Sequence, residues 1–173
     1  IFLLFAITGL AQGEESSKQS ASVSAADEKA IRMVVTQFFN LYPKKDSPAI
    51  ASFWSEKSPY LKGHRQELEG ILAGTDRIEL KSVTFSQVRV EGEKARVRAT
   101  VEFNATEAKT GKPFDVYTSK NRVVILVKEA GVWKILRHIS AERDLAIRLT
   151  ETKGETERAT LLKTETDLVN INL

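Results

Sequence analysis

The sequence has no cysteine, one methionine and only two histidines among its 173 residues. The absence of cysteine excludes disulfide bonds, thiolate metal sites and cysteine nucleophiles. His64 and His138 lie far apart in the sequence with no carboxylate at ligand spacing, so we expect no metal site. The nine glycines form no phosphate-binding loop, and neither a nucleophile elbow nor a zinc-protease motif is present. These absences argue against nucleotide-dependent chemistry, and we expect no cofactor.

The sequence also lacks a large excess of either charge. Lysine and arginine total 26, and aspartate and glutamate total 23, which gives a net charge of +3. The two signs are interspersed, and no basic run is dense enough for a nucleic-acid-binding surface. We therefore expect no nucleic-acid partner. The apolar fraction of 42% is ordinary for a globular protein.

The apolar run at the front of the sequence is short. Residues 1–10, IFLLFAITGL, are apolar except for Thr8 and Gly9, and about ten such residues are too few to span a bilayer of roughly 30 Å. Gly9 and Ala11 have the spacing that a signal peptidase accepts, so we interpret residues 1–11 as a secretory signal without its charged start. The alternative is the end of a membrane anchor that tethers the protein. Both interpretations place the protein outside the cytoplasm, in the periplasm or the extracellular space.

A spacer and then a domain are expected after this segment. Residues 12–26 are rich in serine, alanine and glutamine and have no apolar period, which predicts a flexible linker. We expect one domain over residues 27–141. It begins with three helical segments, which are indicated by apolar positions three and four apart or by a proline at the first helical position. We expect them at about 27–42 with Asp27 as N-cap, at 47–54 with Ser47 as N-cap, and at 58–74.

The apolar period changes from 3.6 to 2 after these helices, which predicts strands. In the strand expected at 94–107, the residues that face inward are apolar. The residues that face outward include Arg96, Arg98 and Glu102, which we expect on a solvated face. In the run VVIL, residues 123–126, successive positions are all apolar, whichever face of the strand they point to. This predicts a strand that is covered on both faces, at least locally. Turn sequences separate four antiparallel strands, expected at 78–90, 94–107, 114–128 and 132–140.

The remaining residues, 142–173, predict a helical extension. Leu145, Ala146 and Leu149 share one helical face, and a second helix is expected at about 156–163. The apolar residues here are too few to form a core of their own. Under the narrower resemblance described below, this region would be a lead-in to helical repeats further downstream.

Two stretches carry a resemblance to a known superfamily. They are AIRMVVTQFFNLYPKKDSPAIASFWS, with the aromatic pair Phe53 and Trp54, and the final strand GVWKILRHIS. Together with the element order, they resemble the nuclear transport factor 2-like superfamily, which includes ketosteroid isomerase and polyketide-cyclase-like domains. The predicted fold class is therefore α+β: three N-terminal helices packed on a curved four-stranded antiparallel sheet, in a cone-like shape, followed by a C-terminal helical extension. The resemblance implies a pocket between the concave face of the sheet and the helices.

Three other stretches carry a narrower resemblance. They are RIELKSVTFSQVRVEGEKARVRATVEFNATEAKTGKP, KNR at 120–122, and ETERATLLKTETDLV. They look like a module of bacterial secreted proteins that precedes tetratricopeptide repeats and often a caspase-like peptidase domain. This resemblance implies an N-terminal accessory domain whose partner domains follow it.

The strand expected at 132–140 holds two of the candidate site residues. By simple alternation Trp133 faces the core together with Arg137, whose guanidinium could hold an anion at the mouth of the pocket. His138 then lies on the opposite phase, so we interpret it as a surface or interface residue, unless a β-bulge reverses the phase. His64 is interpreted as part of an exposed turn.

Aromatic side chains supply the other candidates for ligand contact, which are Trp54, Tyr42 and Tyr117. Chemistry of the ketosteroid isomerase type would require a tyrosine and a buried acid around one carbonyl oxygen. Asp115 follows a turn sequence and is more simply a solvated acid. We therefore predict no catalytic residue.

The predicted function is that of a non-catalytic accessory module of an exported bacterial protein. It would bind a small apolar or anionic molecule, or pack against downstream helical repeats of the same chain. One alternative is an isomerase or dehydratase that uses the cone pocket, and another is a domain that forms a homodimer through the outer sheet face. An enzyme predicts a buried acid or histidine in the pocket. A packing module predicts a filled pocket and a helical extension that projects away from the sheet.

Overall fold

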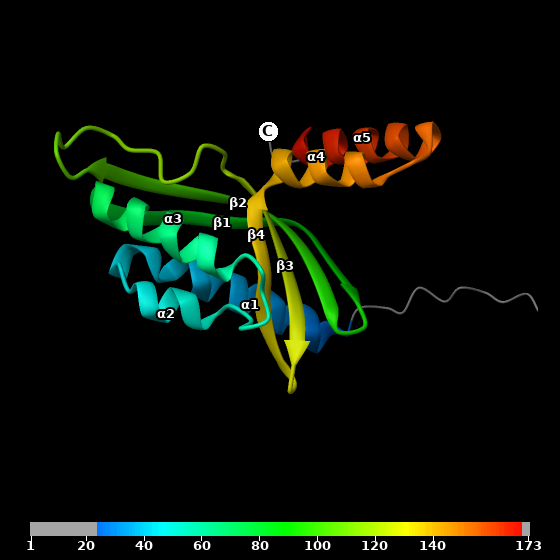
Figure 1. The fold of residues 1–173 in the computed structure, drawn as a ribbon, viewed down its shortest axis with the longest axis horizontal. Helices are drawn as coiled ribbons and strands as arrows, with labels where there is room; N and C mark the ends of the chain where they lie inside the picture. The colour runs from blue at the N-terminus through cyan, green and yellow to red at the C-terminus, as the bar shows by residue number, and fades with distance from the viewer. Residues whose placement is uncertain (1–23, 171–173) are drawn as a thin grey trace, which may run out of the picture.

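The computed structural model describes residues 24–170. The expected signal segment and most of the expected linker lie outside these residues. The predicted α+β fold class is confirmed (Figure 1), and none of the described helices is long and apolar enough to cross a bilayer. The elements are α1 (Ala25–Asn40), a short 3-10 helix η1 (Tyr42–Lys44), α2 (Ser47–Ser52), α3 (Leu61–Gly74), β1 (Thr75–Glu91), β2 (Lys94–Glu107), β3 (Asn121–Glu129), β4 (Val132–Ser140), α4 (Ala141–Glu151) and α5 (Glu155–Asn170).

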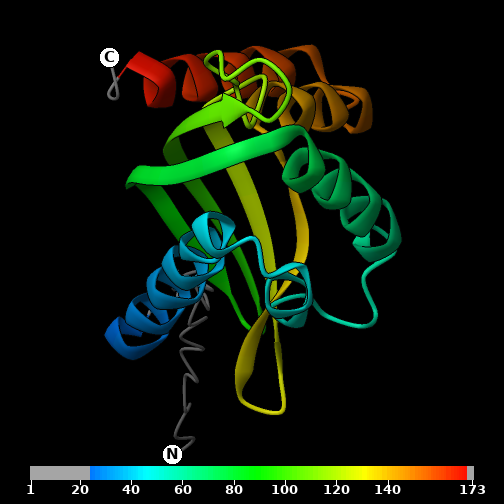
Figure 2. The ribbon, with the colours of Figure 1, turned by 90° about the vertical axis from the view of Figure 1, so that its left-hand side faces the viewer.

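The strands form one curved antiparallel sheet in the order β1-β2-β3-β4 (Figure 2). In β1 the register against β2 shifts three times, which leaves Asp76, Lys81 and Ser86 as extra residues. Each such bulge bends the strand and increases its twist. The β3–β4 hairpin has positive φ at both Ala130 and Gly131, which is the type I′ pattern suited to a two-residue turn.

Helices α1, α2 and α3 lie on the concave side of this sheet (Figure 2). The core forms between them because both surfaces are apolar, as the two periodicities predict. The main contributions of α1 are Ile31, Val35, Phe38 and Phe39. Those of β2 are Ala95, Val97, Ala99 and Val101.

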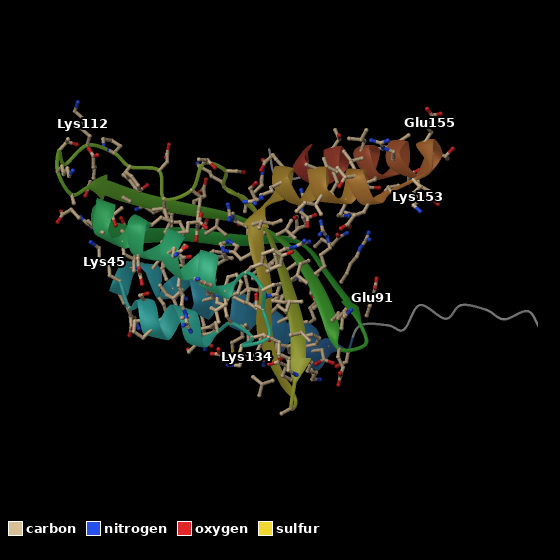
Figure 3. All side chains as sticks on the ribbon, viewed as in Figure 1. Lys45, Glu91, Lys112, Lys134, Lys153 and Glu155 are labelled. Carbon is tan, nitrogen blue, oxygen red and sulfur yellow. The ribbon has the colours of Figure 1, made fainter. Side chains whose placement is uncertain are left out.

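Helices α4 and α5 lie on the opposite, outer side of the sheet (Figure 1). Lys153 and Glu155 mark the turn between them, at the end of the pair that is remote from the β2–β3 loop around Lys112 (Figure 3). α4 packs against β3 and β4. Val123 and Val124, which point to opposite faces, are both fully buried. The prediction that this strand is covered on both faces is confirmed.

The prediction that Arg96 and Arg98 lie on a solvated face is wrong. Nη2 of Arg96 lies 2.6 Å from Oδ2 of Asp144 in α4, and Nη1 of Arg98 contacts Glu165 in α5. The helical extension therefore covers this part of the outer face instead of projecting away from it. Glu102, further along β2, is half-buried and forms an ion pair with Nζ of Lys120 at 3.1 Å.

The helix caps differ slightly from the prediction. α1 begins one turn earlier, with the hydroxyl of Ser24 accepting a hydrogen bond from the backbone N–H of Asp27. The carboxylate of Asp27 instead accepts hydrogen bonds from Nζ of Lys128 and Nε1 of Trp133, which ties α1 to the β3–β4 hairpin. α2 is capped by Asp46, not by Ser47.

Two other boundaries also differ. β3 begins at Asn121, seven residues later than predicted, because the segment after β2 forms a long loop that places Val116 and Tyr117 against the core. α5 extends over Glu155–Asn170 and is about twice as long as predicted. The carboxylate of Glu165, in the additional turns, reaches the sheet.

Candidate functional site

A β-bulge in β4 decides which of its side chains reach the interior. The register of β3 against β4 shifts between Ile125 and Leu126, which leaves Leu136 of β4 as an extra residue. The phase of the strand reverses there, so that His138 faces inward and Arg137 faces outward. The predictions that His138 lies at the surface and that Arg137 faces the core are therefore wrong, and the bulge is the physical reason.

His138 is enclosed by aromatic rings and a guanidinium. Its exposed fraction is 7%, and Nε of Arg122 donates a hydrogen bond to its Nε2 over 2.9 Å. Since Nε2 accepts this bond, the neutral imidazole carries its proton on Nδ1. The rings with centroids 5.4–5.9 Å from that of His138 belong to Phe38, Phe39, Tyr117 and His64.

Arg122 is the second residue of β3, and its side chain points into the interior. Sequence reasoning did not single it out. It shares the inward phase with Val124, and only 6% of its surface is exposed. Its guanidinium carbon lies 4.2 Å from the ring centroid of Tyr117. Among the residues that the structure describes, no carboxylate forms an ion pair with it, whereas Arg96, Arg98 and Arg137 all have acidic partners.

His64 is buried as well, contrary to the prediction of an exposed turn. It belongs to α3, whose buried face consists of Leu61, His64 and Leu68. The imidazole stacks on Trp54 with ring centroids 4.4 Å apart. His64 follows Leu61 by three positions and precedes Leu68 by four. This spacing is the signal in the sequence that places the histidine on the core side of the helix.

A cleft of about 330 Å³ opens between α3 and β4, within the range of volumes that hold small molecules. His64, His138 and Trp54 form its buried part, and Tyr60 lies at its edge. The charged side chains around it belong to Glu67, Arg137 and Arg143. We refer to this site as the α3–β4 cleft.

The four predicted ligand-contact residues divide into two groups. Trp54 and Arg137 line the α3–β4 cleft, and Arg137 is held there by Oδ1 of Asp144 at 3.0 Å. Tyr42 and Tyr117 lie deeper, with their ring centroids 5.9 Å apart. The structure therefore brings all four to one region of the fold, but only two of them to the cleft itself.

Several interior polar atoms of this region have no well-placed hydrogen-bond partner. Seven such buried side-chain atoms occur in the described part of the chain. Two of them, Nε1 of Trp54 and Nε2 of His64, belong to residues of the cleft, and two more are the hydroxyls of Tyr42 and Tyr117, which interact with each other. Buried polar groups are nearly always paired in folded proteins. Their concentration at one place indicates a site where another molecule supplies hydrogen bonds.

Burial and charge keep both imidazoles neutral at physiological pH. Burial, together with the positive charge of Arg122, lowers the pKa of His64 to about 4. The same two causes, in the same order, hold the pKa of His138 well below its ordinary value. Burial raises the pKa of Tyr42 and Tyr117. The cluster therefore offers neutral hydrogen-bonding groups and one cation.

Among the residues that the structure describes, no acidic group of the kind that general-base or metal chemistry would need lies in this interior. Asp115, the acid considered for ketosteroid isomerase chemistry, is exposed, as expected for a solvated acid. Glu67 is exposed at the edge of the cleft. Across residues 24–166, no three histidine, aspartate or glutamate side chains are grouped in a way that could hold a metal ion.

The depressed histidine pKa values predict a stability that falls in mild acid. Between pH 6.5 and about 4, the unfolded chain binds a proton at residue 64 that the folded chain does not bind, so the free energy of unfolding decreases as the pH is lowered. The slope contributed by each such histidine is at most about 1.4 kcal/mol per pH unit. Urea unfolding at several pH values in this window should show a flatter dependence for His64→Gln than for the unsubstituted chain. Identical slopes would contradict the burial of a neutral His64.

No protein-family model matches this chain, and no curated protein matches it at a significant level.

Comparisons of structure do find similar proteins. A proposed aromatic ring hydroxylase from Novosphingobium aromaticivorans aligns over 66% of this chain and 87% of its own, with 16% identity and a TM-score of 0.54. A conserved protein from Planctomyces limnophilus aligns over 66% and 94%, with 19% identity and a TM-score of 0.50. A ketosteroid isomerase-like protein from Erwinia carotovora atroseptica aligns over 66% and 95%, with 16% identity and a TM-score of 0.50. At these identities the likeness concerns the fold alone, and the chain has the α+β cone fold that ketosteroid isomerase-like proteins share.

Proposed function

We propose that this chain is a non-catalytic module that binds a small molecule in the α3–β4 cleft. The observation that carries the proposal is the stacked pair of Trp54 and His64, both buried at the cleft, with Nε1 of the indole and Nε2 of the imidazole left without partners. A ligand with a hydrogen-bonding group would satisfy atoms that otherwise carry a desolvation penalty. The aromatic walls favour a flat, ring-sized ligand.

Filling the cleft should abolish binding. Gly63 lies in α3 at the cleft, and a Cβ at this position would meet no heavy atom within 4 Å. Gly63→Leu would therefore place a side chain at the cleft without a clash of its Cβ. The matched control is Gly70→Leu in the same helix, because Gly70 is exposed and has equally open surroundings.

The measurement is a thermal-shift titration with three one-ring probes: benzoate, benzamide and benzyl alcohol. We expect at least one probe to raise the melting temperature of the unsubstituted chain and of Gly70→Leu, because a ligand that binds only the folded state stabilises it by mass action. Gly63→Leu should show no shift with that probe. A lack of response to all three probes, or an equal response of Gly63→Leu, would count against binding at this cleft.

An isomerase or dehydratase is the second candidate, and the burial of His138 beside Tyr117 favours it. A general base, however, needs an accessible lone pair and a pKa near the working pH. The Nε2 lone pair of His138 accepts the hydrogen bond from Arg122, and the pKa of this histidine is strongly lowered, chiefly by burial. The chain should therefore not accelerate the exchange of deuterium into the α-carbon of cyclohexanone. An acceleration that His138→Gln removes would replace the binding proposal with the enzymatic one.

The wider setting of the module is also part of the proposal. The apolar segment 1–10 followed by small residues supports export, and the narrower sequence resemblance supports an accessory role beside helical repeats. α4 and α5 lie side by side as a helical pair (Figures 1 and 2), which is the kind of element on which further helices can stack. A homodimer formed through the outer sheet face would have to use the area that this pair leaves uncovered.

A further inference from the structure

We propose that the ligand of the α3–β4 cleft is a small carboxylate, and that Arg122 and His138 together bind its anionic group. This inference rests on the proposed function, because it assigns the chemical class of the ligand that the cleft receives. It depends on the charge balance of the interior, on the hydrogen bond between the two residues, and on the charges at the edge of the cleft.

The first argument is the missing counter-ion of Arg122. A buried charge without a partner is strongly unfavourable, and the guanidinium remains protonated at all physiological pH values. The other strongly buried arginine of the described residues, Arg98, contacts the buried carboxylate of Glu165. Arg122 instead has a neutral imidazole as its hydrogen-bond acceptor and the face of Tyr117 beside it.

The carboxylates that exert a charge effect on Arg122 do not replace a direct partner. Glu67 and Glu142 are both exposed, and one carboxylate oxygen of Glu142 accepts a hydrogen bond from the hydroxyl of Ser119 at 2.9 Å. The interior thus keeps one uncompensated positive charge. A carboxylate from a ligand would neutralise it and would match the planar, forked donor geometry of the guanidinium.

The second argument is that His138 connects the cleft to this charge. The imidazole lines the α3–β4 cleft, and Arg122 donates to its Nε2 from the interior side. With Nε2 occupied, Nδ1–H is the donor that the neutral ring can offer to an anion. An anion at His138 would therefore meet a hydrogen-bond donor with a positive charge directly behind it.

The edge of the cleft also favours anions. Arg137 and Arg143 are both cationic lining residues, against the single acidic side chain of Glu67. Arg143 forms no ion pair with any residue in the described part of the chain, while Arg137 shares Asp144 with Arg96. Such an arrangement raises the local concentration of anions and increases their association rate.

The test compares benzoate with benzamide, which has nearly the same shape but no charge, by isothermal titration calorimetry. We expect benzoate to bind the unsubstituted chain at least about tenfold more tightly, because hydrogen bonds to a charged donor are stronger than those to a neutral one. Arg122→Gln should bring the two affinities to within about twofold of each other. Arg122→Lys keeps the positive charge but loses the planar, forked donor geometry of the guanidinium, so it should retain part of the preference for benzoate. This variant replaces Arg122→Gln in the comparison if the glutamine variant does not fold.

Each outcome of this comparison has a defined meaning. Equal affinity of the unsubstituted chain for benzoate and benzamide would overturn the carboxylate inference and leave small-molecule binding intact. A preference for benzoate that survives in both Arg122 variants but disappears in Arg143→Gln would overturn the assignment to Arg122. Binding of neither probe, together with no thermal shift from benzyl alcohol, would instead overturn the proposed function itself.

Discussion

Replacing Asp144 with asparagine is expected to lower the free energy of unfolding by about 3–5 kcal/mol, because it removes the charge from the centre of a buried ionic network. The carboxylate has no solvent exposure, and its oxygens lie 2.6 Å from Arg96, 3.0 Å from Arg137 and 3.9 Å from Arg148. These three arginines come from β2, β4 and α4. Without Asp144, the guanidinium groups would repel one another in a place that water reaches poorly. Urea unfolding at neutral pH measures the loss.

Glu151→Gln is the matched control for this experiment. It removes the same charge from the same helix, but Glu151 is exposed and forms no ion pair with a residue of the described chain. We expect its effect to stay within about 0.5 kcal/mol, as for most surface substitutions. Hydrogen exchange should show that Asp144→Asn increases the opening of α4 and α5 first. If the two variants lost the same stability, the network would not be what holds the helical pair on the sheet.

The parts of this fold that the sequence predicts well are those where one face of an element is apolar over several turns. The stripe of α1 and the alternation of β2 are of this kind, and the structure buries most of the residues that the periods select. Even two of the three bulges of β1, at Lys81 and Ser86, are recorded in the sequence. The apolar residues of the strand are spaced two, three, two, three and two apart: Ile78, Leu80, Val83, Phe85, Val88 and Val90. Each step of three marks an extra residue that keeps the apolar set on one face.

The bulge in β4 has no comparable signal, and it is the reason that the candidate site was misplaced. Ile135 and Leu136 are adjacent and both apolar, so either could have continued the inward phase. A single extra residue then exchanges His138 and Arg137 between the two faces. The residue that was expected at the surface became the centre of the site, and the residue that was expected inside became part of its edge.

The outer face was misjudged for a different reason. Alternation shows that Arg96 and Arg98 share one face, but it does not show what covers that face. The partner of Arg98 is Glu165, which lies 67 positions later in the sequence, in the region that was expected to project away from the sheet if the domain is a packing module. Charged residues of both signs on two surfaces can produce a buried contact that hydrophobic patterning does not indicate.

Replacing Phe38 with alanine is expected to lower the free energy of unfolding by about 3–5 kcal/mol, which is the usual cost of removing a buried phenylalanine ring. Phe38 is fully buried in α1, and its ring has edge or tilted contacts with the rings of Phe39, Tyr42, Phe53, His64 and His138. No other described aromatic ring contacts both histidines and two further rings of the core at once. The substitution should therefore weaken the site as well as the core. Urea unfolding measures the first effect.

The effect on the site is visible in the protonation of the histidines. Burial is the main cause of the low pKa of His138, so water that enters the space left by the ring should raise this pKa toward the ordinary value near 6.5. An NMR titration of the imidazole resonances in Phe38→Ala tests this, with Met33→Ala as the control, since Met33 lies in the same helix and is 53% exposed. A large loss of stability with unchanged histidine titration would mean that the surroundings collapse onto the cavity and keep His138 dry. A rise in the pKa would show that the aromatic enclosure keeps the imidazole neutral, and a neutral imidazole is what lets His138 accept the hydrogen bond from Arg122.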